Sequence, residues 1–346
     1  MSELDTRRCL VLWLLAGLTA TTFAVGLRLG AVPLGWDKLW LALTGRGDLL
    51  SLTERTVVFS IRLPRAVCAA TVGAVLGLCG AAMQGLFRNP LADPGLVGVS
   101  SGAALGSVAY LKLAAGALSG LSVMAGTLAL PACAFAGGLA MTFVMHHAAQ
   151  VGGRTVVTLM LLAGIAINAL GAAGIGLVLF FSDDELLRQF TFWTLGSVGH
   201  ASWLKLAAAS PFFLAALVLI PRHARALNAL LLGEAEAGHL GVDLQRVKTT
   251  LIFVTAAGVG AAVSVAGGIG FIGLVVPHLV RQAIGADHRW LIPASALTGA
   301  VLLIAADMLA RTVAAPAELP VGIVTAVVGA PVFFSLLQAQ RRSSFH

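Results

Sequence analysis

The sequence predicts an all-α polytopic membrane protein with about ten transmembrane helices. Of its 346 residues, 58% are apolar and only 11% are charged, whereas a soluble domain carries about 25% charged residues. The mean hydropathy of +0.95 agrees with this class. A soluble enzyme, a nucleic-acid-binding protein and a disulfide-stabilised secreted domain are excluded, because each needs a charged or cross-linked surface that this chain lacks.

Ten apolar segments are candidate crossings within a single transmembrane domain, since one crossing takes roughly 20 residues. The first is too long for the core of a cleaved signal peptide and is expected to remain as a span. The eighth is short and interrupted by glycine, which in a membrane indicates a broken helix shielded by its neighbours. The domain covers residues 1–346, and the segments are 10–30, 61–85, 95–111, 121–145, 155–181, 203–221, 246–267, 271–284, 290–311 and 320–339.

Two polar intervals are expected to lie outside the bilayer. Residues 31–60 form the longer one, and residues 182–189 precede an apolar piece, 190–199, that is too short to cross. The net charge of +7 indicates topology, since Lys and Arg collect at cytoplasmic helix ends. Their distribution weakly favours both termini on the cytoplasmic side.

Small residues are abundant, and most of them are expected to serve helix packing. Cysteines lie in or beside apolar segments with no CxxC pair, so they predict packing residues and no metal site. Glycines at helical spacing let helix backbones approach closely in a membrane. The cysteines are Cys9, Cys68, Cys79 and Cys133, and the spaced glycines are Gly73, Gly77, Gly80, Gly95, Gly98, Gly102 and Gly106.

No nucleotide-binding loop is present, because no GxxxxGK[ST] motif occurs. Gly268, Gly270 and Gly273 spell GxGxxG, but they follow an apolar helix without the βαβ context of a dinucleotide site. We expect a flexible break between two spans instead, with Gly267, Gly268 and Gly270 as its gate or hinge.

Acidic residues inside the spans are nearly absent, which bears on how transport would be driven. Asp307 is the exception, and Arg311 follows one turn later, so local pairing is expected. An ion-coupled secondary carrier, which needs acids in its spans, is therefore a remote alternative, and the energy is expected from a separate protein. No catalytic residues are predicted, because the histidines lack a nucleophile or paired carboxylates.

A polar segment between the sixth and seventh spans, residues 222–248, is amphipathic and helix-forming. Gly233, Gly238 and Gly241 interrupt it, which predicts two short helices meeting at a turn. Such an element could lie in a groove of a partner protein. An ordinary interfacial helix is the alternative.

Several motifs together resemble the iron-siderophore, haem and cobalamin permeases of type II ABC importers, over nearly the whole chain. They are Arg62-Leu63-Pro64-Arg65, Met83-Gln84-Gly85-Leu86-Phe87-Arg88-Asn89-Pro90-Leu91-Ala92-Asp93-Pro94-Gly95, Gly267-Gly268-Ile269-Gly270-Phe271-Ile272-Gly273-Leu274, Val276-Pro277-His278, Ala306-Asp307, and Glu318-Leu319-Pro320-Val321-Gly322.

The resemblance implies a cobalamin-permease-like fold in a bacterial inner membrane. It implies a homodimer of this permease with two copies of a cytoplasmic ABC ATPase, which binds Mg-ATP, and one periplasmic substrate-binding protein. Lipid surrounds the spans and no nucleic acid is bound. The chain itself would be a permease subunit without enzymatic activity.

The resemblance also assigns residues to two contact surfaces. Arg62, Arg65 and Arg311 would dock acidic residues of the binding protein, since guanidinium groups pair with carboxylates in a bidentate way. On a coupling segment at about 223–245, Glu234, Leu240 and Gly241 would fit the ATPase, with Leu240 as the apolar anchor.

For the cargo, the string from Ser182 to Ser197 together with Trp203 resembles the haem-transporting branch most. Haem would be transported cargo and not a bound cofactor; ferric siderophore and cobalamin are the alternatives. A planar porphyrin needs a wide, weakly binding wall, which the fifth span offers with Ala163, Ala166, Asn168, Gly171 and Ala172. His200 departs from the family pattern, either as an iron contact or, more simply, as a hydrogen-bonded residue.

Overall fold

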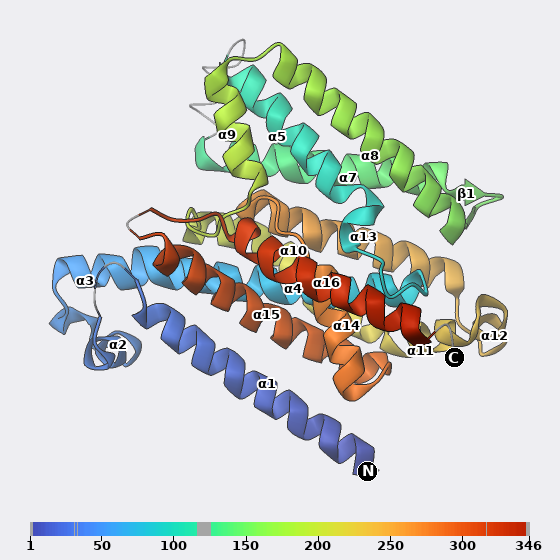
Figure 1. The fold of residues 1–346 in the computed structure, drawn as a ribbon, viewed down its shortest axis with the longest axis horizontal. Helices are drawn as coiled ribbons and strands as arrows, with labels where there is room; N and C mark the ends of the chain where they lie inside the picture. The colour runs from blue at the N-terminus through green and yellow to red at the C-terminus, as the bar shows by residue number, and fades with distance from the viewer. Residues whose placement is uncertain (1–2, 31, 33, 116–125, 316, 344–346) are drawn as a thin grey trace.

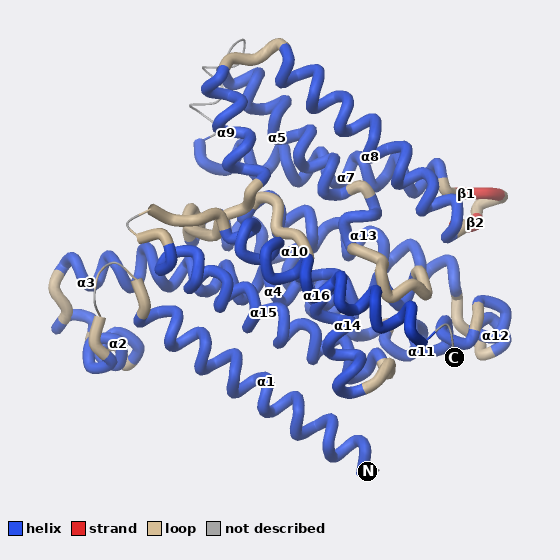
Figure 2. Tube along the Cα trace, viewed as in Figure 1, coloured by secondary structure: helices blue, strands red, loops and turns tan. Residues whose placement is uncertain are grey.

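The computed structural model describes residues 3–343, apart from 31, 33, 116–125 and 316. Nearly all of the described chain is helical, and most helices run along the long axis of the molecule (Figure 2). Within the described residues, β-structure is limited to a small hairpin of β1 (Gln150–Val151) and β2 (Arg154–Thr155).

Each of the ten predicted crossings corresponds to a helix. By length and composition, seven helices of the described chain could cross a membrane. Helix α5 has 17 residues, and α14 and the apolar part of α16, Val321–Ser335, are shorter. The predicted start of the fourth span, residue 121, lies outside the described residues. The helices are α1 (Glu3–Arg28), α4 (Leu63–Leu86), α5 (Val99–Ala115), α7 (Ala129–Ala148), α8 (Val157–Phe180), α10 (Trp203–Arg222), α13 (Leu244–Ala266), α14 (Ile272–Ile284), α15 (His288–Val313) and α16 (Val321–Ser343).

The second span begins earlier than the hydropathy predicted. Its helix starts at α3 (Leu52–Thr56), where Ser51 and Glu54 form a capping box, and continues through a π-helical turn into α4. Pro64 in the first turn of α4 donates no backbone hydrogen bond. A wide turn just before a proline keeps such a helix continuous.

Helix α4 is the centre of the packing. A Cβ added to Gly77 would lie 2.3 Å from the Ser295 carbonyl oxygen of α15, and one added to Gly73 would lie 2.3 Å from the Gly299 oxygen. These backbones therefore touch, as the spaced glycines predicted. The four cysteines are free, and the two on α4, Cys68 and Cys79, are fully buried.

The helices form two groups (Figure 1). One contains α5, α7, α8 and α9 (Asp184–Thr194), the other contains α1, α4, α14, α15 and α16, and α13 packs between α7 and α4. At 11 residues, α9 is too short to cross; it includes part of the polar interval 182–189 and the first half of the apolar piece 190–199.

Short elements gather at the two ends of the bundle. One end carries α2 (Trp36–Leu43) and α3; the other carries α11 (Ala224–Leu232), α12 (Glu234–His239) and the β-hairpin (Figure 1). We call these the outer and inner end, after the predicted orientation. Helix α1 begins and α16 ends at the inner end, as an even number of crossings requires.

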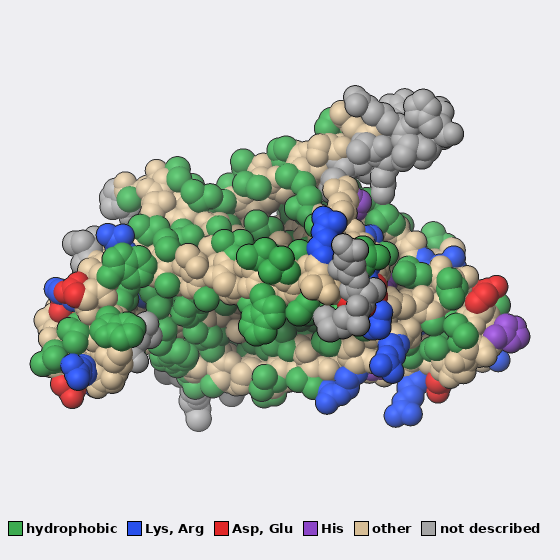
Figure 3. Space-filling model, turned by 90° about the horizontal axis from the view of Figure 1, so that it is seen from below, with side chains coloured by type: hydrophobic (Ala, Val, Ile, Leu, Met, Phe, Trp, Pro, Cys, Tyr) green, Lys and Arg blue, Asp and Glu red, His purple; other side chains and the backbone are tan. Residues whose placement is uncertain are grey.

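Charged side chains also gather at these two ends, and the surface between them is largely hydrophobic (Figure 3). On α8, large apolar residues such as Leu162, Ile165 and Leu170 are also exposed. A belt of this kind fits a hydrocarbon environment.

Candidate functional site

At the outer end, a network of ion pairs joins α4, α15 and the loop before α16. Arg65 Nε donates to Asp307 Oδ1 at 2.9 Å, and Arg65 NH1 donates to both carboxylate oxygens of Glu318 at 3.0 and 2.9 Å. Arg311 Nε lies 3.6 Å from Asp307 Oδ2. The predicted Asp307–Arg311 pair is therefore confirmed, but the sequence did not reveal that Arg65 shares it. The Asp307 side chain is 3% exposed, and that of Glu318 is 52% exposed.

The two other arginines predicted for docking also point into the chain. Arg62 donates to the carbonyl oxygens of Leu27 and Arg28 at 2.8 and 2.7 Å, and Arg311 NH2 donates to Gly26 O at 2.6 Å. These carbonyls end α1, where cations are favourable partners. In this structure the arginines hold α1, α4 and α15 together, and their docking role stays a prediction.

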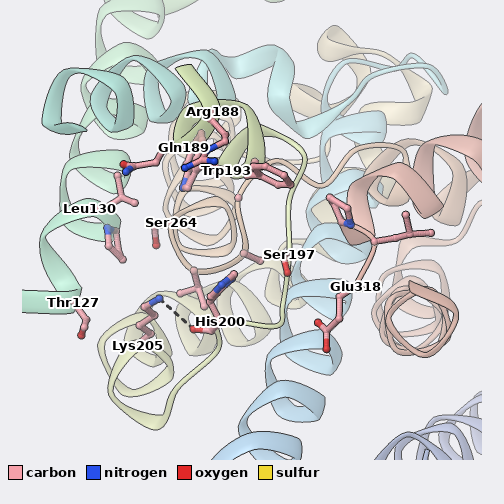
Figure 4. A pocket seen from close by; sticks show the side chains of 17 residues that line it. Thr127, Leu130, Arg188, Gln189, Trp193, Ser197, His200, Lys205, Ser264 and Glu318 are labelled. Carbon is pink, nitrogen blue, oxygen red and sulfur yellow. Dashed lines mark hydrogen bonds between the residues drawn. The ribbon is translucent and has the colours of Figure 1, made fainter. Parts of the chain in front are cut away.

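A cavity of about 580 Å³ opens at the outer end beside this network (Figure 4). Its side chains come mainly from α7, α9, the end of α13 and the loop before α16, and α10 contributes Lys205. Arg188, His200 and Lys205 bring positive or titratable groups, and Phe192 and Trp193 bring aromatic surface. The full lining is Thr127, Leu130, Pro131, Arg188, Gln189, Phe192, Trp193, Ser197, His200, Lys205, Ser264, Val265, Ala266, Gly267, Glu318, Leu319 and Pro320.

Local structure fixes the wall that α9 contributes. Asp183 caps this helix by accepting from Leu186 N at 3.0 Å, and Leu186 and Phe190 are buried against α5. The opposite face of α9 is then turned to the cavity. His200 is exposed on the rim, where its backbone oxygen accepts from Lys205 Nζ at 3.2 Å.

The predicted glycine break separates α13 from α14 and lies under this cavity. A Cβ added to Gly267, whose φ is +71°, would meet Trp193 O at 2.2 Å, and one at Gly268 would meet Thr194 O at 2.6 Å. Gly270 has nothing within 4 Å of such an atom. The break is confirmed, and it is packed tightly against the end of α9; its role as a hinge stays a prediction.

Helix α8, the predicted wall of the pathway, has one packed face. Asn168 Oδ1 accepts from Ser101 Oγ of α5 at 2.6 Å, and Gly171 is buried against the same serine. The single polar group of the predicted wall is thus used in helix packing. The alanines of the predicted wall are less buried. Ala163 is half-buried, and Ala166 and Ala172 are exposed.

At the inner end, α11 and α12 meet at Gly233, whose φ of +128° suits glycine alone. This confirms the two short helices predicted. Leu240, at 65% exposure, projects an apolar side chain where charged groups prevail, and the neighbouring turn contains Gly241 with φ +81°. The Glu234 carboxylate is half-exposed and lies 2.7 Å from Lys248 Nζ. An exposed apolar tip flanked by charge is suited to a protein partner.

A second contact ties α11 to α15. Asn228 Nδ2 donates to Asp287 Oδ1 at 2.6 Å, and Asn228 Oδ1 accepts from His288 N at 2.8 Å. Hydrogen bonds from Arg289 hold the pKa of the Asp287 carboxyl well below its usual range. Sequence reasoning missed Asn228, because its partners lie about 60 residues away in the chain.

These features define a class of protein: a polytopic permease subunit whose sequence contains no ATP-binding loop and whose inner end presents a surface for a partner. Comparison with known proteins agrees. The profile of the FecCD transport family matches residues 18–339, and the chain belongs to that family.

Among its relatives is the hemin transport system permease protein HmuU of Yersinia pestis, 47% identical over 90% of each chain. The cobalamin import system permease protein BtuC of Halobacterium salinarum is 42% identical, over 93% of this chain and 84% of its own. A solved structure, described as an inward-facing conformation of a metal-chelate type ABC transporter, has a TM-score of 0.80 at 31% identity and covers 95% of this chain and 99% of its own.

The chain is thus the permease subunit of an ABC importer, and ATP is hydrolysed by a separate ATPase partner. Permeases of such importers work as dimers with ATPases and a substrate-binding protein.

Proposed function

We propose that this permease imports haem across a bacterial inner membrane, receiving it from a periplasmic binding protein. The cavity at the outer end carries the proposal. Haem is a flat apolar ring with two carboxylates at one edge. Arg188 and Lys205 can pair with carboxylates, and Phe192 and Trp193 offer flat apolar surface. His200 on the rim supplies an imidazole, a common protein ligand of haem iron.

Cobalamin and ferric siderophores are the alternative cargoes, and a direct competition separates them. The permease, its ATPase and its binding protein are reconstituted in proteoliposomes, and ATP-driven uptake of hemin, cobalamin and a ferric siderophore is measured side by side. We expect hemin uptake to dominate. Uptake of either other cargo at a higher rate would overturn the assignment.

A variant tests the role of the cavity in the same assay. Arg188→Gln with Lys205→Gln should lower hemin uptake several-fold, because two partners for the carboxylates are lost. Arg46→Gln is the matched control, since Arg46 is exposed at the same end but outside the cavity. Equal uptake by the double variant and the control would refute a role for the two cations.

Docking of the binding protein is proposed to centre on Arg65. A carboxylate of that protein would replace the half-exposed Glu318 on the Arg65 guanidinium, and the buried Asp307 would keep the arginine in place. Glu318→Gln should then tighten binding, because the competing charge is gone. Weaker binding would mean that Glu318 itself meets a cation on the partner.

At the inner end, α12 and the turn after it are proposed to fit a groove of the ATPase, with Leu240 as the apolar anchor and Glu234 and Gly241 beside it. Two permeases would pair so that their α8 helices line the pathway, with two ATPases and one binding protein in the assembly. Alanines such as Ala166 and Ala172 would give the cargo a smooth wall. The termini would lie in the cytoplasm.

A further inference from the structure

The β-hairpin between α7 and α8 is held by two side chains of α13. Gln245 Oε1 accepts from Thr155 N at 2.9 Å, and Gln245 Nε2 donates to Thr155 Oγ1 at 2.8 Å. Lys248 Nζ donates to Thr155 O at 3.1 Å. The backbone N–H, the backbone carbonyl and the hydroxyl oxygen of this one threonine are therefore each bonded to the same helix. We call this arrangement of Thr155, Gln245 and Lys248 the clasp.

Lys248 also connects the clasp to α12. Its ammonium group donates to Glu234 Oε2 at 2.7 Å, and Glu234 is the first residue of α12. Thr155 and Lys248 are only 3% and 4% exposed. A buried charge is stable only with partners on several sides. The ammonium group is therefore bound to Glu234 and Thr155 at once, and movement of one strains its bond to the other.

Thr155 stands two residues before the start of α8. Val156, the residue between, donates to Ala149 O at the end of α7 and accepts from Met160 N in the first turn of α8. A shift of Thr155 must therefore move the first turn of α8. A cavity of about 590 Å³ beside the clasp is lined by residues of the hairpin, α8, α12 and α13, which leaves room for such a shift.

We propose that the clasp transmits motion of α12 to α8, with Lys248 and Thr155 as the positioning residues. The inference rests on the proposed contact of α12 with the ATPase. When nucleotide binding displaces α12, the Glu234–Lys248–Thr155 chain pulls the start of α8 and so changes the width of the pathway. The clasp makes no contact with cargo.

The first test does not depend on the cargo. Arg154 is exposed in the hairpin and precedes Thr155, so trypsin cleavage after Arg154 reports how firmly the hairpin is held. In the assembled transporter, the cleavage rate is compared between the nucleotide-free and the ATP–vanadate-trapped state. We expect a difference in the wild type and its loss in Lys248→Met, which removes both the bond to Glu234 and the bond to the Thr155 carbonyl oxygen. Thr158→Val, at an exposed threonine lining the same cavity, should keep it.

The second test measures coupling in proteoliposomes as hemin imported per ATP hydrolysed. Thr155→Val, which removes the hydroxyl bond to Gln245 and keeps the carbonyl bond to Lys248, should lower this ratio at most about fivefold, the factor expected from one ordinary hydrogen bond. Lys248→Met, which removes both bonds of the ammonium group at similar volume, should lower it further. ATPase binding should remain in both variants.

The outcomes separate the hypotheses. Transmission through the clasp would be overturned by either of two results. One is an unchanged ratio of hemin imported to ATP hydrolysed in both variants, and the other is a wild-type cleavage rate that is the same in the nucleotide-free and the trapped state. Loss of the ATPase in Lys248→Met would also contradict it, because Lys248 would then belong to the contact surface itself. Import of cobalamin in place of hemin by the wild type would overturn the proposed cargo and leave the cleavage result unaffected.

Discussion

Arg65 offers a test of how burial sets the contribution of an ion pair to stability, because its two acidic partners differ in exposure. Asp307→Ala removes a carboxylate that is 3% exposed and shared by Arg65 and Arg311. Glu318→Ala removes one that is 52% exposed and pairs with Arg65. The two variants delete the same chemical group from the same network.

The expected magnitudes follow from that difference. Breaking a buried pair leaves an uncompensated buried charge and costs about 3–5 kcal/mol. Arg65 keeps Glu318 in the Asp307 variant, so we take the lower end, about 3 kcal/mol. An exposed pair contributes at most about 1 kcal/mol. At roughly 2 °C per kcal/mol for a large chain, the melting temperature should fall by about 6 °C in Asp307→Ala and by at most about 2 °C in Glu318→Ala.

The assay is thermal unfolding of the purified subunit in detergent, followed by the monodisperse fraction that remains after heating. Asp307→Asn provides a further point, since it keeps an acceptor for Arg65 but loses the charge, and it should fall between the two alanine variants. Equal losses in the two alanine variants, or a larger loss in Glu318→Ala, would refute the reasoning.

Two other predictions concern the inner end and the glycine break. Leu240→Asp should abolish copurification of the ATPase, because the proposed apolar anchor becomes charged. Leu49→Asp is the control: Leu49 is also exposed but lies at the outer end, so the ATPase should still copurify. Loss of the ATPase in both variants would point to misfolding. Gly267→Ala should lower the melting temperature by several degrees, since its Cβ would lie 2.2 Å from Trp193 O at a positive φ. Gly270→Ala, with nothing within 4 Å, should be tolerated; tolerance of both would show that the break is loose.

Local pattern was enough to predict the spans, the short piece 190–199 that does not cross, the broken region before α14 and the paired helices at the inner end. Each depends on features within a few turns of chain: apolar length, glycine positions and amphipathic spacing. The Asp307–Arg311 pair was equally accessible, because the two residues are one helical turn apart.

The contacts of the arginines predicted for docking could not be predicted from local sequence pattern. Arg65 meets Asp307 and Glu318 across more than 240 residues, and Arg62 meets the end of α1 across 35. No periodicity connects such positions. Asn168 is a further example. The sequence suggested that it belongs to a wall facing the cargo, but its side-chain oxygen accepts a hydrogen bond from Ser101 of a neighbouring helix.

Composition and short motifs were enough to place this chain in a membrane with about ten predicted crossings. The missing ATP-binding loop and the acid-poor spans predicted that its energy comes from another protein. Which charges are buried in pairs, which glycines bring backbones into contact, and how Thr155 joins α13 to α8 could be seen only in the folded chain. Those contacts join residues far apart in the chain, and their positions are set only when the helices have packed.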